Sequence, residues 1–288
     1  MALIGDAFDS WVTSQINKRQ EKLGEGITGT RSLDGIKAFN QSAPWIRLTS
    51  GVSINQPTEE EANFPGVSVY DSLANSGLLQ AGTWEGNLLS RNFILSGGVT
   101  NESGVGFAGI NNGQLKSSYG FGYTNDNIKD GQGYVPMPGI TSAEFEYKND
   151  GALAVAKISV KAYSKAQFQI IDVLFQRPGY TCLLEFGHSV FLDNSGNVQY
   201  AGKGNYSYAT APFNKILDAP SKNNNYFQMA KLITAERKKW HGNYEAFFGK
   251  ITKFNWKFNE DGTYDITVNL VGTGDVISSL RVNAPKIT

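Results

Sequence analysis

The chain has little cysteine, histidine or charge, and each shortage excludes a class of protein. One Cys and two His in 288 residues cannot build a Cys/His zinc site, and a single cysteine forms no intramolecular disulfide. Lys and Arg together number 26, as do Asp and Glu, so the formal net charge is zero. This balance argues against nucleic-acid binding as the main task, because phosphate contacts need a clustered excess of cations.

Long apolar segments are lacking as well. The first residues, MALIGDAFDSW, have neither the basic start nor the apolar stretch of a secretory signal. No run of about 18 apolar residues, the length of a membrane-spanning helix, occurs in the sequence. We therefore expect a soluble protein that is made inside a cell and does not enter a membrane.

Glycine, by contrast, is abundant: 32 of 288 residues, about 11% against an average of roughly 7%. Eleven of these glycines lie within residues 97–139, where Phe and Tyr interleave with them. A loop of this length is uncommon in a compact domain and tends to be functional. Aromatic residues are depleted in disordered segments, so we predict that residues 97–139 take a defined structure inside an assembly. A flexible insertion is the alternative.

The N-terminal part predicts one helix, one connector and one strand. Helical spacing of apolar residues over 6–23 indicates an amphipathic helix, with Asp6 as its N-cap and Gly24 as its stop. Residues 24–35 indicate a flexible connector, and residues 44–54 a strand. The apolar stripe of the helix consists of Phe8, Trp11, Val12 and Ile16.

Residues 140–275 predict the order β-β-α-β-β-α-β-β. Alternating residues around an Asn-Asp-Gly turn predict a hairpin over 143–163. Ser164 and Gln167 form a capping box for a helix that ends at Pro178-Gly179. A strand follows over residues 180–192, with a turn at 193–196 and a return strand, and a second helix spans residues 226–240.

The clearest pattern is a hairpin over residues 251–271, with its turn at 259–262. Its Lys and Asn residues on one strand match Asp and Thr on the other, which indicates a polar face. The opposite face is apolar and is either core or interface. It consists of Phe254, Trp256, Phe258, Tyr264, Ile266, Val268 and Leu270.

Two groups of residues could suggest a cofactor site or a catalytic site, and both have simpler interpretations. The G-x-G-x-x-G pattern from Gly104 to Gly109 lacks the following helix that a dinucleotide site requires. Glu185, His188 and Asp193 lie close in sequence, but an odd spacing places Glu185 and His188 on opposite faces of a strand. We therefore predict no acid-base or metal site here, although a hydrolase using Glu185 and His188 is an alternative.

The remaining reactive residues also have structural interpretations. Cys182 lies in the apolar run TCLLEF, where a thiol is ordinarily inert packing. His241 ends the second helix beside Arg237-Lys238-Lys239 and is interpreted as a cation at a helix C-terminus. The basic run itself is interpreted as a solvated face. We expect no enzymatic activity, no metal and no cofactor.

Four stretches of the sequence, in order, resemble one protein family. They are PWIRLTSGVSI, SSYGFGY, the segment from VPMPGITSAEF to FLDN, and the segment from GNYEAFFGKITKF to SSLRVN. Together they resemble the baseplate hub proteins of tailed bacteriophages, and the similarity covers most of residues 42–283. Related hub proteins are often longer and some carry lytic domains, but we expect no lytic activity from this chain.

The resemblance implies a mainly β, α+β fold of the tail-tube type. This is a β-barrel or sandwich with long hairpins and two flanking helices, here with an N-terminal helix added. We expect a docking arm over residues 1–35, a β-rich part over 36–139 that includes the Gly-rich loop 97–139, and the tail-tube-like barrel over 140–288.

The resemblance also implies a structural role in the virion. We expect a hub ring, a trimer or hexamer, that joins the tail tube protein to the spike or other baseplate proteins, with DNA only in transit through its channel. A tail tube or tube-initiator subunit is one alternative, and a carbohydrate-binding receptor module is another. The residues expected at the assembly interface are Phe8, Trp11, Trp45, Phe254, Trp256, Phe258, Tyr264 and Ile266.

Overall fold

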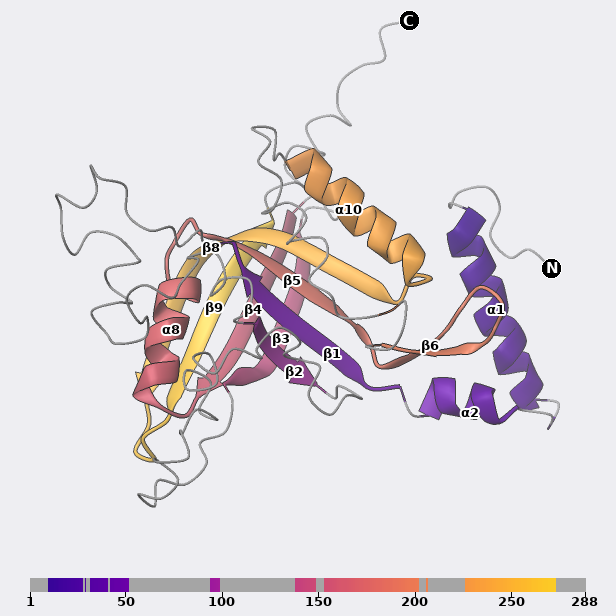
Figure 1. The fold of residues 1–288 in the computed structure, drawn as a ribbon, viewed down its shortest axis with the longest axis horizontal. Helices are drawn as coiled ribbons and strands as arrows, with labels where there is room; N and C mark the ends of the chain where they lie inside the picture. Colours follow the sequence, from indigo (N-terminus) through magenta and orange to yellow (C-terminus); the bar gives the residue numbers. More distant parts are fainter. Residues whose placement is uncertain are drawn as a thin grey trace, which may run out of the picture. The chain divides into compact units, whose positions relative to one another are not determined.

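The computed structural model describes residues 10–27, 29, 32–40, 42–51, 94–98, 138–148, 153–201, 206 and 226–272. Within these residues the fold is mainly β, and seven strands form a closed barrel in the order β1-β2-β3-β4-β9-β8-β5 (Figure 1). The predicted β-rich α+β class is thereby confirmed. The barrel strands are β1 (Pro44–Ser50), β2 (Ile94–Gly98), β3 (Gly139–Lys148), β4 (Leu153–Ala162), β5 (Thr181–His188), β8 (Tyr244–Phe258) and β9 (Tyr264–Gly272).

The chain divides into two compact units that alternate along the sequence. Unit 1 comprises residues 1–46, 98–106 and 185–246, and unit 2 comprises residues 47–97, 107–184 and 247–288. The stretches predicted from sequence, 1–35, 36–139 and 140–288, are each contiguous, unlike the two units. In addition, β2 pairs with β3 at Ser96 and Gly139, so the barrel draws strands from both sides of the predicted last boundary.

Both predicted hairpins are present and lie next to each other in one antiparallel sheet. β3 pairs with β4, β4 with β9, and β9 with β8. The alternation seen in sequence places Ile158, Val160, Val268 and Leu270 in the core, where they are buried. Gly262 closes the β8–β9 turn at φ 80°, a left-handed conformation that glycine adopts without strain.

The predicted capping box starts helix α8 (Lys165–Phe175). The Ser164 hydroxyl accepts a hydrogen bond from the Gln167 amide, and the Gln167 side chain accepts one from the Tyr163 amide at 2.7 Å. These two bonds satisfy amide groups that the first helical turn leaves unpaired. The helix buries Ile170, Ile171, Leu174 and Phe175 as its apolar stripe.

Unit 1 contains helices α1 (Ser10–Ile27), α2 (Leu33–Asn40) and α10 (Tyr226–Lys239). α1 runs past Gly24, so the predicted stop was wrong, because one helical glycine costs only about 1 kcal/mol. The predicted N-cap Asp6 lies outside the described residues. The predicted flexible connector was also wrong over its last residues: α2 begins after Ser32, whose hydroxyl accepts a hydrogen bond from the Gly35 amide at 3.1 Å.

The strand predicted over residues 180–192 is divided by Ser189. Its backbone amide donates to the Ala43 carbonyl at 2.7 Å, and its hydroxyl accepts from the Ala43 amide at 3.0 Å. The chain after it, β6 (Val190–Leu192), pairs with β7 (Val198–Tyr200) in a separate sheet. The turn between β6 and β7 is confirmed, with the Asp193 carboxylate accepting from the Ser195 and Asn197 amides.

Most of the Gly-rich segment 97–139 lies outside the described residues, so its ordering in an assembly stays a prediction. Among the described helices, none combines the length and the apolar character needed to cross a membrane.

Candidate functional site

The residues predicted for an assembly interface differ sharply in exposure. Trp256 and Phe258 near the end of β8 are 50% and 56% exposed, whereas Trp45 and Ile266 are 2% and 1% exposed. The last two side chains offer no surface to a partner, and we remove them from the predicted interface. The other predicted residues are Phe254, Tyr264 and Trp11, which are partly exposed, and Phe8, which lies outside the described residues.

Four aromatic side chains of unit 2 form one cluster, which we call the aromatic platform: Phe168 of α8, Trp256 and Phe258 of β8, and Tyr264 of β9. The Phe168 ring stacks on Tyr264 at 4.5 Å and meets Trp256 edge-on at 5.0 Å between centroids. Phe258 lies opposite Tyr264 in the β8–β9 ladder, with a ring separation of 5.1 Å. The sheet register and α8 therefore hold half-exposed rings in a fixed arrangement, as a preformed contact surface requires.

The antiparallel run of strands that carries the platform begins with β3 and ends with β8. Within the barrel β3 is followed by β2, and the described residues of this pair meet at Ser96 and Gly139. Hydrogen bonds join Ile251 of β8 to Gly179 and Tyr180, just before β5 begins. The remainder of β8, residues 252–258, therefore extends beyond β5. The end of a strand that extends past its neighbour can pair with a strand of another chain.

β3 and β8, the two end strands of this run, carry opposite charges in the same rows of the sheet. One row runs from Glu144 on β3 through Lys157 and Asn269 to Lys253 on β8. A second row begins at Glu146 on β3 and ends at Lys250 on β8. A copy of the chain that continued the sheet in register would thus place an acid beside a lysine.

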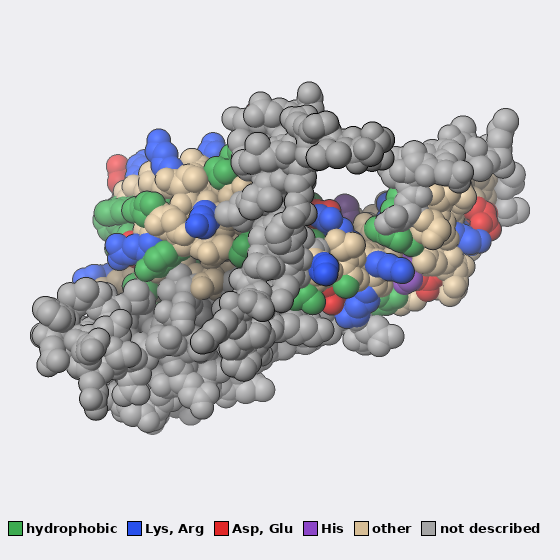
Figure 2. All heavy atoms as spheres, turned by 90° about the horizontal axis from the view of Figure 1, so that it is seen from above, with side chains coloured by type: hydrophobic (Ala, Val, Ile, Leu, Met, Phe, Trp, Pro, Cys, Tyr) green, Lys and Arg blue, Asp and Glu red, His purple; other side chains and the backbone are tan. Residues whose placement is uncertain are grey.

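The polar face of this sheet mixes charges of both signs. Lys157 lies 3.7 Å from Glu144, and Lys161 lies 3.8 Å from Asp261 at the β8–β9 turn. Both are surface pairs and contribute little to stability. Figure 2 shows basic and apolar side chains interspersed on the face of the molecule that it presents. Hydrogen bonds from the Thr263 hydroxyl and amide lower the pKa of the Asp261 carboxyl, which fixes the turn in its ionised, hydrogen-bonded form.

Unit 1 contains the second aromatic cluster, which is a core. Trp240, at the end of α10, lies 5.9 Å from Trp45, 5.9 Å from Tyr244 and 5.9 Å from Phe191 between ring centroids. All four residues are buried. The buried Glu185 accepts a hydrogen bond from the Tyr244 hydroxyl at 2.7 Å. This bond gives Glu185 a structural role in holding Tyr244.

The structure does not support the interpretation of His241 as a cation at the end of a helix. It occupies the left-handed region at φ 51°, after a helix end closed by a hydrogen bond from the Gly242 amide to the Arg237 carbonyl. Its Nε2 lies 3.0 Å from the Tyr206 hydroxyl, and burial lowers its pKa more than Asp193 raises it. The imidazole is therefore neutral near pH 7, and the cation interpretation was wrong.

No family model, no curated protein and no solved structure matches the chain. The resemblance to phage hub proteins therefore supports a proposal about function and nothing firmer.

The other reactive residues contribute no catalytic arrangement in the described part of the chain. Glu185 is buried and His188 is exposed, as their odd spacing on a strand predicted. Burial raises the pKa of the Cys182 thiol, so the sulfur stays protonated and unreactive. No group of three or more His, Cys, Asp or Glu residues suited to a metal occurs among the described residues.

Sequence reasoning found the hairpin face but missed two features. The arrangement of β3 and β8 at the two ends of the antiparallel run depends on how strands pair across the barrel, which no local pattern encodes. A cavity in unit 1 was also missed, because its lining comes from α1, α2, the end of β5, β6 and two loops. For the end strands, a usable signal existed: Glu144 and Lys253 occupy outward positions in the two strands at the ends of the hairpin pair.

Proposed function

We propose that the chain is a non-enzymatic structural subunit of a bacteriophage tail, and that it forms the hub ring between the tail tube and the spike. Its barrel then serves as the tail-tube-like domain that the sequence resemblance implies. The ring is made of copies of this chain, with the tail tube protein and a spike or baseplate protein as its neighbours. DNA passes through the channel without specific binding.

The observation that carries this proposal is the opposite charge of β3 and β8, the first and last strands of the antiparallel run β3-β4-β9-β8. A head-to-tail contact between β8 of one copy and β3 of the next continues the antiparallel order, because β3 and β8 run in opposite directions. Heterologous contacts of this kind close into rings when the rotation per copy allows it. The aromatic platform lies beside the β8 edge and adds apolar area to the contact.

A charge-swap experiment tests this contact. Glu144→Lys and Lys253→Glu each place like charges side by side in the row that would continue between copies, so each single variant should lose ring formation. The double variant restores one pair of opposite charges, with the order reversed, and should recover it. Mass photometry and analytical ultracentrifugation of the protein, alone and with its tail partners, measure the assembly state.

Charge reversal at Lys231, an exposed residue of α10, is the matched control and should leave the assembly unchanged. Circular dichroism spectra should show that all variants fold. Single variants that assemble like the wild type, or a double variant that does not recover, would contradict the edge-to-edge contact.

The place in the particle requires a separate measurement. An electron-microscopy map of the intact tail should locate the ring at the junction of tube and baseplate, and quantitative mass spectrometry should find few copies per virion. A high copy number along the tube would instead support the alternative of a tail tube subunit. Absence of the chain from the particle would reject both.

A further inference from the structure

Unit 1 contains a cavity of about 310 Å³, at the lower end of the sizes typical of small-molecule sites. One side is apolar and comes from α2 and β6. The other side is polar and comes from α1, from the end of β5 and from the chain segments before β1 and β8. The lining residues are Arg19, Ala38, Phe39, Ser42, His188, Val190, Phe191, Leu192 and Asn243.

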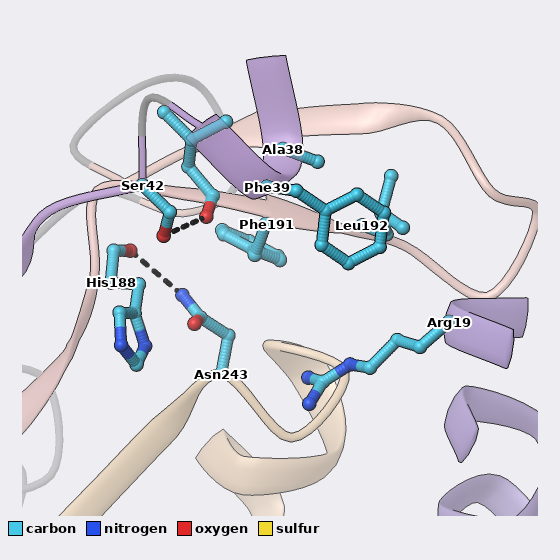
Figure 3. Close-up of a pocket in the computed structure, with 9 residues that line it drawn as sticks. Arg19, Ala38, Phe39, Ser42, His188, Phe191, Leu192 and Asn243 are labelled. Carbon is cyan, nitrogen blue, oxygen red and sulfur yellow. Dashed lines mark hydrogen bonds between the residues drawn. The ribbon is translucent and has the colours of Figure 1, made fainter. Parts of the chain in front are cut away.

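The polar groups of the cavity are held in place by hydrogen bonds within unit 1. The Asn243 amide nitrogen donates to the His188 carbonyl at 2.9 Å, and the Ser42 hydroxyl donates to the Val190 carbonyl at 2.8 Å (Figure 3). Asn243 is itself buried. These bonds fix the lining before any ligand arrives, which lowers the entropic cost of binding.

Arg19 is the charged group of the cavity. Figure 3 shows its side chain extending from α1 toward Asn243. Its neighbours Lys18 and Lys22 each pair with a glutamate of α1 at 2.7 Å. Arg19, in contrast, has no carboxylate partner in the described part of the chain, and no Asp or Glu lines the cavity. The guanidinium therefore presents its donors to whatever occupies this space.

We propose that this cavity binds a carboxylate attached to a short apolar chain. Arg19 pairs with the carboxylate, because a planar guanidinium matches its two oxygens with two parallel hydrogen bonds. The apolar chain lies against Phe39, Phe191 and Leu192. Such a group can come from a free aliphatic acid or from the carboxyl terminus of a polypeptide whose last residue is apolar.

The first experiment compares octanoate with octanamide, which has the same chain and a neutral head, by isothermal titration calorimetry on the full-length protein. Octanoate should bind more tightly by about tenfold or more, the range of a charge-assisted hydrogen-bonded pair. Arg19→Gln should remove this difference and leave octanamide binding unchanged. Arg19 is exposed at the surface of α1, so the substitution should not impair folding.

Lys18→Gln is the matched control, because it removes the same charge from the adjacent position outside the cavity lining. It should keep the preference for octanoate. A second arm compares acetyl-Gly-Leu-Leu with a free carboxylate and the same peptide with an amidated end. Tighter binding of octanoate supports a free acid as the ligand, and tighter binding of the peptide acid supports a chain terminus.

Two results would overturn the proposal. One is that neither acid binds better than its amide. The other is that Arg19→Gln and Lys18→Gln weaken acid binding equally, which would show a general charge effect in place of a site. Both results are independent of ring assembly, so the proposal stands or falls separately from the proposed function.

Discussion

Units 1 and 2 each contain a cluster of aromatic side chains, but the two clusters have opposite relations to solvent. In unit 1, Trp45 and Trp240 are buried among other rings and a hydrogen-bonded Glu185–Tyr244 pair. In unit 2, Trp256 and Phe258 are about half exposed on the aromatic platform. The same residue types thus form a core in one unit and an available surface in the other.

This difference shows that aromatic residues predict an interface only when it is known which helices and strands cover them. Trp45 is covered because α10 and β8 bring Trp240 and Tyr244 against it. On the platform, α8 contributes one ring, Phe168, and Trp256 and Phe258 stay about half exposed. Substitutions in the two clusters should therefore affect different properties: stability in unit 1 and assembly in unit 2.

The largest effect on stability is expected from Trp45→Ala. A fully buried aromatic side chain contributes transfer free energy and fills a volume that the surrounding rings cannot close, so the loss should be about 3–5 kcal/mol. Urea denaturation followed by circular dichroism measures it. Trp256→Ala is the comparison and should cost about 1 kcal/mol, because half of its surface is already in water. Equal losses at the two positions would refute the contrast between core and platform.

A smaller but still clear loss of stability is expected from Gly187→Ala, which tests how tightly the unit 1 core is packed. A Cβ at this position would lie 2.2 Å from the Asn243 carbonyl oxygen and 3.0 Å from the Trp45 ring. Overpacking of this kind costs about 1–3 kcal/mol. Gly24→Ala is the matched control: outside the backbone of its own helix, no atom of the described residues lies within 4 Å of its added Cβ, and alanine should stabilise α1 by about 0.5–1 kcal/mol. A neutral Gly187→Ala would show that the core can rearrange.

The sequence allowed the local elements to be predicted well, because their signals are local. The β8–β9 hairpin follows from strict alternation around an Asn-Glu-Asp-Gly turn, and α8 follows from the Ser164–Gln167 capping box. The start of α2 was missed because Gly, Thr and Ser residues make up most of the segment before it, and its cap at Ser32 is visible only in the structure.

The features that depend on long-range packing could not be read from the sequence. Trp45 and Trp256 have the same strand-like surroundings, and only the fold decides that the first is buried. The place of β3 and β8 at the two ends of the antiparallel run depends on strand pairing across the barrel. The cavity brings Arg19 near Asn243, residues that are far apart in the chain, and neither residue lies in a motif.

For the platform, the double substitution Trp256→Ser and Phe258→Ser should change assembly more than stability. The free energy of unfolding should fall by only about 1–2 kcal/mol, since both rings are about half exposed. The protein should nevertheless fail to form rings, because fixed aromatic side chains supply much of the binding energy of interfaces. Mass photometry and urea denaturation on the same samples measure both quantities. Wild-type rings in this variant would exclude the platform from the contact.

The smallest effect is expected at His241, where unit 1 holds a neutral imidazole. Burial lowers the pKa of His241 below its unfolded value of about 6.5, so the unfolded chain binds more protons as the pH falls below this value. Stability linked to this group is therefore complete above about pH 6.5 and decreases toward pH 5.5. Its neighbours do not titrate in this range: burial raises the pKa of Tyr206, and hydrogen bonds outweigh burial to lower the pKa of Asp193.

Replacing His241 by Asn removes the titrating group and keeps a residue that tolerates the left-handed backbone at φ 51°. The loss of stability between pH 7.5 and pH 5.5, measured by urea denaturation, should be smaller in His241→Asn than in the wild type. An unchanged slope in His241→Asn would mean that this imidazole accepts a proton in the folded state as readily as in the unfolded chain. The aromatic core around Trp240 would then be more open to water than its burial indicates, and the contrast between the two clusters would be correspondingly weaker.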